Sequence, residues 1–177
     1  YSILRDFDFF PKSALIPTDK AVEHIELSYP LWVKRADFHA MQTDDVCICR
    51  HSQELSDILT SLRKRAVKQT FIQEHIEGDL IKFYGIGDKW FKWFYHKDQT
   101  LKGYHFDINK LESITKQSAK GLGLEIYGGD IVINQDSKIC LIDMNAWPSF
   151  ALYRKEASQH IACHIIRTHK NQRPIMV

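Results

Sequence analysis

Two acidic residues and one amide near the end of the chain are spaced so that they could hold a metal ion. Asp143 and Asn145 are two residues apart in a run that reads as a β-strand, so both side chains point to one face. Asp130 lies in the preceding strand-like run, across a predicted turn at 135–138, and could share that face. Carboxylate and amide oxygens suit a hard cation such as Mg²⁺. The alternative is a polar strand face that only contacts water.

A lysine also stands inside a short apolar strand. Lys34 follows Leu-Trp-Val in the predicted strand 31–35. Burying an ammonium group is costly unless it meets an anion, and a phosphate is a natural partner. The alternative is that Lys34 faces solvent or pairs with a surface carboxylate.

The stretch 73–79 reads Gln-Glu-His-Ile-Glu-Gly-Asp, a strand that leads into a turn between two lobes. Exposed backbone groups there can recognise a flat heteroaromatic ring, and carboxylates nearby can accept from ribose hydroxyls. A solvated strand end is the alternative, as is a surface position for Lys82 on the next strand. Together, the lysine, the hinge and the acidic site favour Mg²⁺–nucleotide binding in a chain that has no glycine-rich loop followed by Lys-Ser/Thr.

Hydrophobic periodicity and turn residues predict a mixed α+β chain. The expected strands are 13–17, 31–35, 45–50, 70–76, 80–86, 89–96, 130–134 and 139–148. The expected helices are 19–27, 52–67 with Ser52 as N-cap, 107–121 and 149–168. Antiparallel hairpins gather in the second half, and the two lobes are expected to meet near 73–79.

Composition limits the classes of partner. The formal net charge of +2 is too small to indicate nucleic acid or a membrane surface as a partner. The four cysteines show no Cys-x-x-Cys spacing, so we expect buried, reduced thiols and a cytoplasmic protein. We find no signal peptide and no apolar run of membrane-spanning length. The chain begins with Tyr1 and in the middle of a pattern, from which we expect a fragment of a longer protein.

The order of these motifs resembles the ATP-grasp superfamily over about residues 11–150. Residues 29–34 are similar to that family's strand whose lysine contacts ATP phosphate, and 71–78 to its adenine-binding hinge. Residues 122–130 followed by 142–148 are similar to its metal-binding end, where acid-x-Asn with a proline three residues later is the most specific match.

The resemblance implies an ATP-grasp fold, in which two α+β lobes with mainly antiparallel sheets grip a nucleotide. The first lobe, with its lid, would be 1–75, and the second, with the metal site, 76–177. The family's N-terminal substrate domain has no counterpart in these residues. The lid loop 37–43 departs from the family pattern, because Phe38, His39 and Met41 stand where glycines are usual.

The resemblance also implies a role for each matching residue. Leu80 stands where many of these ligases have a ribose-binding acid, so Asp79 or Glu77 would replace it. The implied ATP-binding residues are Lys34 at the phosphate, Gln73, Glu74, His75 and Ile76 around the adenine, and Asp79 at the ribose. The implied Mg²⁺ ligands are Asp130, Asp143 and Asn145, and the implied catalytic residue is Lys82, in contact with the transferring phosphate or the substrate.

The implied activity is that of an ATP- and Mg²⁺-dependent ligase. Such an enzyme activates a carboxylate as an acyl phosphate, which an amine or thiol of a small molecule or peptide then attacks. Gln73, Glu74 and Lys82 also resemble the inositol trisphosphate kinase branch, so a small-molecule kinase is the second interpretation. A nucleotide-binding module without catalysis is the third, and an unrelated α+β domain with coincidental motifs is the fourth.

Overall fold

The computed structural model describes residues 3–20, 25–37 and 42–171. The predicted lid residues Phe38, His39 and Met41 lie outside these ranges. The chain forms two compact units, residues 1–76 and 77–177. Each unit is described separately below.

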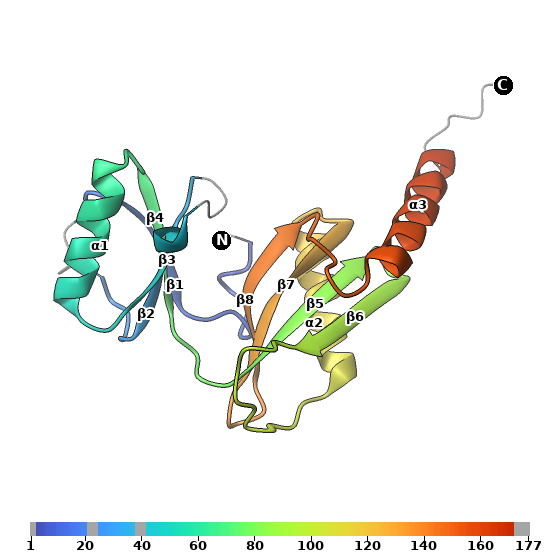
Figure 1. Ribbon diagram of the computed structural model, residues 1–177, viewed down its shortest axis with the longest axis horizontal. Helices are drawn as coiled ribbons and strands as arrows, with labels where there is room; N and C mark the ends of the chain where they lie inside the picture. Colours follow the sequence, from blue (N-terminus) through green and yellow to red (C-terminus); the bar gives the residue numbers. More distant parts are fainter. Residues whose placement is uncertain (1–2, 21–24, 38–41, 172–177) are drawn as a thin grey trace. The chain divides into compact units, whose positions relative to one another are not determined.

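The first unit is an antiparallel sheet with one helix packed on it (Figure 1). Within the described residues its strand order is β1-β4-β2-β3. The elements are β1 (Ser13–Pro17), β2 (Leu31–Arg35), β3 (Val46–Cys49), α1 (Ser52–Lys64) and β4 (Gln69–Glu74). Leu55, Leu59 and Leu62 of α1 bury against Leu31, Val33 and Ile72 of the sheet, because these residues follow the helical and strand periods respectively.

The second unit is an antiparallel sheet with a helix on each face (Figure 1). Its strand order in the described residues is β6-β5-β7-β8. The elements are β5 (Asp79–Ile86), β6 (Trp90–Tyr95), α2 (Ile108–Gly121), β7 (Ile126–Ile133), β8 (Ile139–Ala146) and α3 (Arg154–Asn171). Tyr84, Ile86, Trp90 and Phe150 pack with Ala157 of α3 on one face, and α2 covers the other.

The predicted α+β class with antiparallel sheets is confirmed, and most predicted elements are found within a few residues. The predicted helix 19–27 is wrong where it is described, because Asp19 lies in a turn and 25–28 have no regular structure. Ile25 and Leu27 instead pack as an irregular segment against the core of the first unit. The final helix begins at Arg154 rather than at residue 149, because Phe150 has a φ of 50° and turns its ring into the core.

Other expectations are refined by local geometry. His51, not Ser52, caps α1, since its side chain accepts a hydrogen bond from the Glu54 backbone N–H.

All four cysteines are free, but only Cys49 and Cys140 are buried, and Cys163 is exposed on α3. Within the described residues we find no helix that combines the length and the apolar character needed to cross a membrane.

A buried carboxylate organises the residues that flank segment 38–41. Asp45 is 1% exposed and pairs with Arg65 after α1, while Arg35 Nη1 lies 3.6 Å from Asp45 Oδ1. Arg35 Nε also donates to Asp37 Oδ1 at 2.8 Å, and Arg65 Nη1 lies 3.0 Å from Asp44 Oδ2. These ion pairs tie the end of β2, the start of β3 and the end of α1 together.

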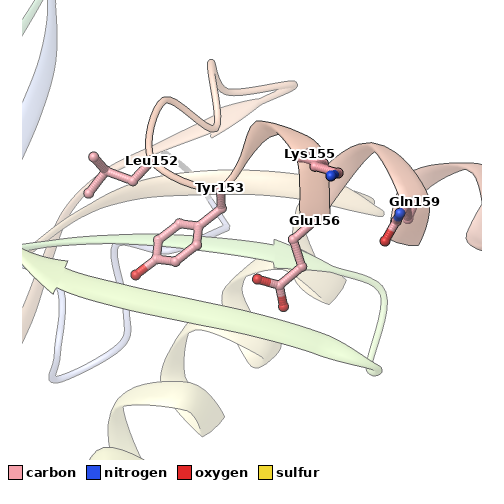
Figure 2. Close-up of a pocket in the computed structure, with 5 residues that line it drawn as sticks. All are labelled: Leu152, Tyr153, Lys155, Glu156 and Gln159. Carbon is pink, nitrogen blue, oxygen red and sulfur yellow. The ribbon is translucent and has the colours of Figure 1, made fainter.

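A second polar contact fixes α3 to its sheet. Trp90 Nε1 donates to Glu156 Oε1 at 2.8 Å, and Lys92 Nζ lies 3.0 Å from the same oxygen. Figure 2 shows Tyr153, which directly precedes α3, and Glu156 of α3 pointing towards the strands. Both residues line a cavity of about 300 Å³. Both donors favour the ionised carboxyl group, so the hydrogen bond from Trp90 and then that from Lys92 lower the pKa of Glu156.

We predict that Glu156→Gln removes an acid-sensitive part of the stability. A carboxyl group whose pKa is lowered by folding stabilises fully above its unfolded value, and that stabilisation is lost as the pH falls through the folded pKa. The difference in melting temperature between wild type and variant should therefore shrink as the pH falls from neutral through 4.5 and below. Thermal melts over this range measure it, with the exposed Glu26→Gln as control. A difference in melting temperature that stays constant with pH would contradict the assignment of this stabilisation to the ionised Glu156 carboxyl group.

Candidate functional site

Four polar side chains form a row across three strands of the second unit. Lys82 on β5 pairs in register with Asp130 on β7, which pairs with Asp143 on β8, so all three share one face. Lys82 Nζ lies 2.7 Å from Asp130 Oδ1, and Asn145 Nδ2 donates to Asp143 Oδ2 at 2.6 Å. We call Lys82, Asp130, Asp143 and Asn145 the polar row. The structure thus places Asp130, Asp143 and Asn145 on one face of the sheet.

A β-bulge between β7 and β8 makes the row possible. Ile131 pairs with Leu141, but Asp130 pairs with Asp143, so Ile142 is an additional residue in β8. Without that shift Asp130 would oppose Ile142, and Asp143 would point to the α2 face. Met144 points away from the acids, and Ile142 is the bulged residue.

Two glycines in β7 allow the close approach of the strands beside the bulge. A Cβ atom at Gly129 would lie 2.1 Å from the backbone oxygen of Asp143, and one at Gly128 would lie 2.8 Å from Pro148 Cγ. Neither position has room for a larger side chain. The glycines therefore bring β8, with Asp143 and Asn145, against Asp130.

The first unit carries a second cluster of polar side chains, Lys34 and Gln73, on the sheet face opposite α1. Lys34 Nζ donates to Gln73 Oε1 at 3.3 Å and lies 5.9 Å from the centre of the Phe71 ring. Gln73 is 1% exposed, and its Nε2 has no hydrogen-bond partner among the described residues. An unpaired buried amide donor costs about 1–3 kcal/mol. An acceptor group on a ligand, such as a phosphate or base oxygen or nitrogen, would satisfy it.

The remaining predicted hinge residues divide between the two faces of the sheet. Glu74 follows Gln73 in β4 and points to the other face, where its Oε1 accepts from the Ser28 backbone N–H at 3.1 Å. His75 Nδ1 accepts from Trp32 Nε1 at 3.0 Å, so neutral His75 carries its proton on Nε2. Ile76 is half-buried and ends the first unit. The structure therefore groups Lys34 with Gln73, and Trp32 with His75, but leaves the Glu74 side chain apart.

Asp79 has a structural role that sequence reasoning did not foresee. Its side chain is fully buried, Oδ1 accepts from the Lys102 backbone N–H at 2.6 Å, and Oδ2 accepts from that of Tyr104 at 2.9 Å. Both carboxylate oxygens thus hold the segment after β6, which leaves no exposed surface for a ribose hydroxyl. We correct the expectation for Asp79 accordingly and leave it out of the nucleotide site.

The donor set of the polar row suits Mg²⁺ that arrives with phosphate. In the described part of the chain, no group of three or more His, Cys, Asp and Glu side chains is arranged to hold a metal. The polar row offers two carboxylates and one amide, and Mg²⁺ commonly takes one or two carboxylates together with phosphate oxygens. The residues therefore fit a nucleotide-linked cation better than a permanent all-protein metal site.

Sequence reasoning missed Trp32, and it named Lys82 without foreseeing that Lys82 pairs with Asp130. Trp32 precedes Lys34 by two residues, so the strand period already placed it on the same face, and its indole partner His75 was not apparent. Lys82 was expected at the surface when taken alone, but it is partly buried against Asp130. Because such pairings join residues about fifty positions apart, only strand register reveals them.

The chain belongs to the RimK-like ATP-grasp family, whose domain model matches residues 11–168. This confirms the resemblance inferred from the motifs. A search among curated proteins gave no match.

Solved structures share the fold at low sequence identity. The D-alanine–D-alanine ligase of Coxiella burnetii matches with a TM-score of 0.73 and 13% identity, over 97% of this chain and 56% of that one. A RimK-domain ATP-grasp protein of Sphaerobacter thermophilus gives 0.67 and 16%, over 93% and 63%. The ATP-grasp ligase PsnB, solved with precursor peptide PsnA2 and AMPPNP, gives 0.64 and 18%, over 94% and 56%. The chain thus spans less than two thirds of each of these proteins.

We predict that Gly129→Ala destabilises the second unit by about 1–3 kcal/mol. The new methyl group would meet the Asp143 backbone oxygen, so β8 must move and the polar row must open. Urea unfolding measures the loss, and Gln135→Ala in the exposed turn of the same hairpin should change stability by less than about 0.5 kcal/mol. Equal stability of Gly129→Ala and wild type would show that the strands do not approach this closely.

Proposed function

We propose that this chain is the catalytic portion of an ATP- and Mg²⁺-dependent ligase. Its reaction would convert a carboxylate into an acyl phosphate, which an amine or thiol then attacks with release of phosphate. The observation that carries the proposal is the polar row, which places two carboxylates, an amide and a lysine on one sheet face in a member of the ATP-grasp family.

Lys34 and Gln73 are our candidates for holding the nucleotide in the first unit. The Lys34 ammonium donates to Gln73 Oε1. The Gln73 Nε2 group, which has no partner among the described residues, adds a neutral donor beside this cation. A charged and a neutral donor side by side suit a phosphate oxygen or a ring nitrogen. His75, oriented by Trp32, and the backbone at Ile76 are the proposed contacts of the adenine.

Asp130, Asp143 and Asn145 are the proposed Mg²⁺ ligands. When bound, Mg²⁺ neutralises phosphate charge and so favours phosphoryl transfer. PsnB has been solved with Mg and ADP, which supports the same cofactor pair for this chain. The Lys82 ammonium lies 2.7 Å from Asp130 and can reach an anion at that carboxylate, so we assign it to the transferring phosphate or the substrate.

The substrate class is a small molecule or a peptide. The structural relatives include a D-alanine–D-alanine ligase and a ligase solved with a precursor peptide, which supports both types. Lys82 on the strand after the hinge favours a small-molecule kinase as second candidate, in which a hydroxyl group receives the phosphate. All four cysteines are free, in keeping with a reducing, cytoplasmic setting.

We predict that Asp143→Ala/Asn145→Ala weakens Mg²⁺–ATP binding by at least about tenfold, since two of three proposed ligands are lost. Isothermal titration calorimetry of the wild type and the variant, with and without Mg²⁺, provides the measurement. Asp136→Ala, in the exposed turn of the same hairpin, should bind as the wild type does. Equal affinity of the double variant and the wild type would remove these residues from the metal site.

We predict that this protein forms a hydroxamate and ADP when it is given ATP, Mg²⁺, hydroxylamine and a panel of carboxylates. Hydroxylamine replaces the natural nucleophile and displaces phosphate from the acyl phosphate, and the resulting hydroxamate gives a coloured complex when Fe³⁺ is added. A stable phosphate ester on an alcohol would identify a kinase instead. Nucleotide binding without ADP release by the full-length protein, over the whole panel, would identify a binding module and refute the ligase.

A further inference from the structure

A cavity of about 760 Å³ lies in the second unit, away from the polar row. It is bounded by the β5–β6 turn, one side of α2 and the start of β7, and its volume is typical of ligand pockets. Tyr127 lines it from the sheet, whereas Asp130, three residues further along β7, points to the opposite face. The cavity is therefore separate from the proposed metal ligands.

Tyr127 lines this cavity and carries a buried hydroxyl group. The residue is 1% exposed, and its hydroxyl has no hydrogen-bond partner in the described part of the chain. The ring lies across Gly85, where a Cβ atom would come within 2.2 Å of it. Burial raises the pKa of Tyr127, with smaller contributions from Asp88 and Glu112, so the phenol remains a donor. A ligand oxygen would give this buried donor its acceptor.

The charged residues around the cavity are of two kinds. Lys116 is engaged, with Nζ 2.7 Å from Glu112 Oε1 and 3.1 Å from the Asp88 backbone oxygen. Glu125 is also engaged, with Oε2 2.8 Å from His164 Nε2 of α3. The Asp88 carboxylate and the Lys120 ammonium have no ion-pair partner among the residues that the structure describes. One charge of each sign therefore remains available at the same cavity.

We propose that this cavity binds a small zwitterion of the α-amino acid class. The ligand's ammonium group would pair with Asp88, and its carboxylate with Lys120 and the Tyr127 hydroxyl. Both charges of such a ligand would then be compensated, and the buried phenol would donate to a charged oxygen. The remaining lining residues include Ser113 and Gln117, whose polar groups suit a hydrophilic side chain. The site goes beyond the ATP-dependent activity and does not depend on it.

The test is a binding titration of the full chain with free amino acids as probes. Each proteinogenic amino acid is added at millimolar concentration without nucleotide, and the shift in melting temperature is followed by calorimetry on those that stabilise. We expect at least one to bind, and Tyr127→Phe and Lys120→Ala each to weaken it by about tenfold. Lys110→Ala, an exposed lysine on the same helix outside the cavity, should bind as the wild type does.

Three outcomes would overturn the proposal. The first is that no amino acid stabilises the protein at millimolar concentration. The second is that acetate or methylamine alone binds as well as the amino acid, because a single charge would then be enough. The third is that Tyr127→Phe and Lys120→Ala bind the amino acid as tightly as the wild type, which would place it elsewhere. Tyr127→Phe keeps the ring, so its folding is expected to be intact and its melt without ligand checks this.

Discussion

The second unit is arranged around two carboxylates that directly oppose each other on neighbouring strands. Asp130 and Asp143 pair in register, and like charges in that position repel and destabilise a sheet. Lys82 on β5, the strand on the other side of β7, offsets the charge of Asp130. The Asn145 amide donates to Asp143. A cation carrying more charge than Lys82 would compensate the pair further, which is why this arrangement suits Mg²⁺.

In both units the candidate site residues lie on the sheet face opposite the helix that covers the main core. The first sheet buries one face under α1 and the second buries one face under α2, and strand alternation places every second residue on the opposite face, which α3 covers in part in the second unit. Lys34 and Gln73 use that alternation in the first unit, whereas the polar row in the second needs the bulge after Leu141 to restore it. The polar row shares its face with the Tyr84–Phe150 core under α3, so rigid apolar packing supports the acids from one side.

Several residues that break local rules lie at the candidate sites. A lysine interrupts an apolar strand at Lys34, and two glycines interrupt β7 at positions where a β-branched residue would be usual. Tyr127 keeps a buried hydroxyl without a hydrogen-bond partner among the described residues, which a phenylalanine would avoid. Such conflicts are expected where a chain trades stability for binding. Asp79 shows the opposite case, because a promising carboxylate is fully occupied by backbone N–H groups.

The sequence by itself determined the α+β class, the antiparallel strands, the family and the residues worth testing, because apolar periodicity and short motifs are local properties. It predicted Asp143 and Asn145 on one face from their spacing alone. Only the tertiary structure decided that Asp130 joins them, that Lys82 meets Asp130 and that Glu74 points away from Gln73. The reason is that strand register and a one-residue bulge join residues far apart in the chain, and a shift of one position exchanges the two faces of a sheet.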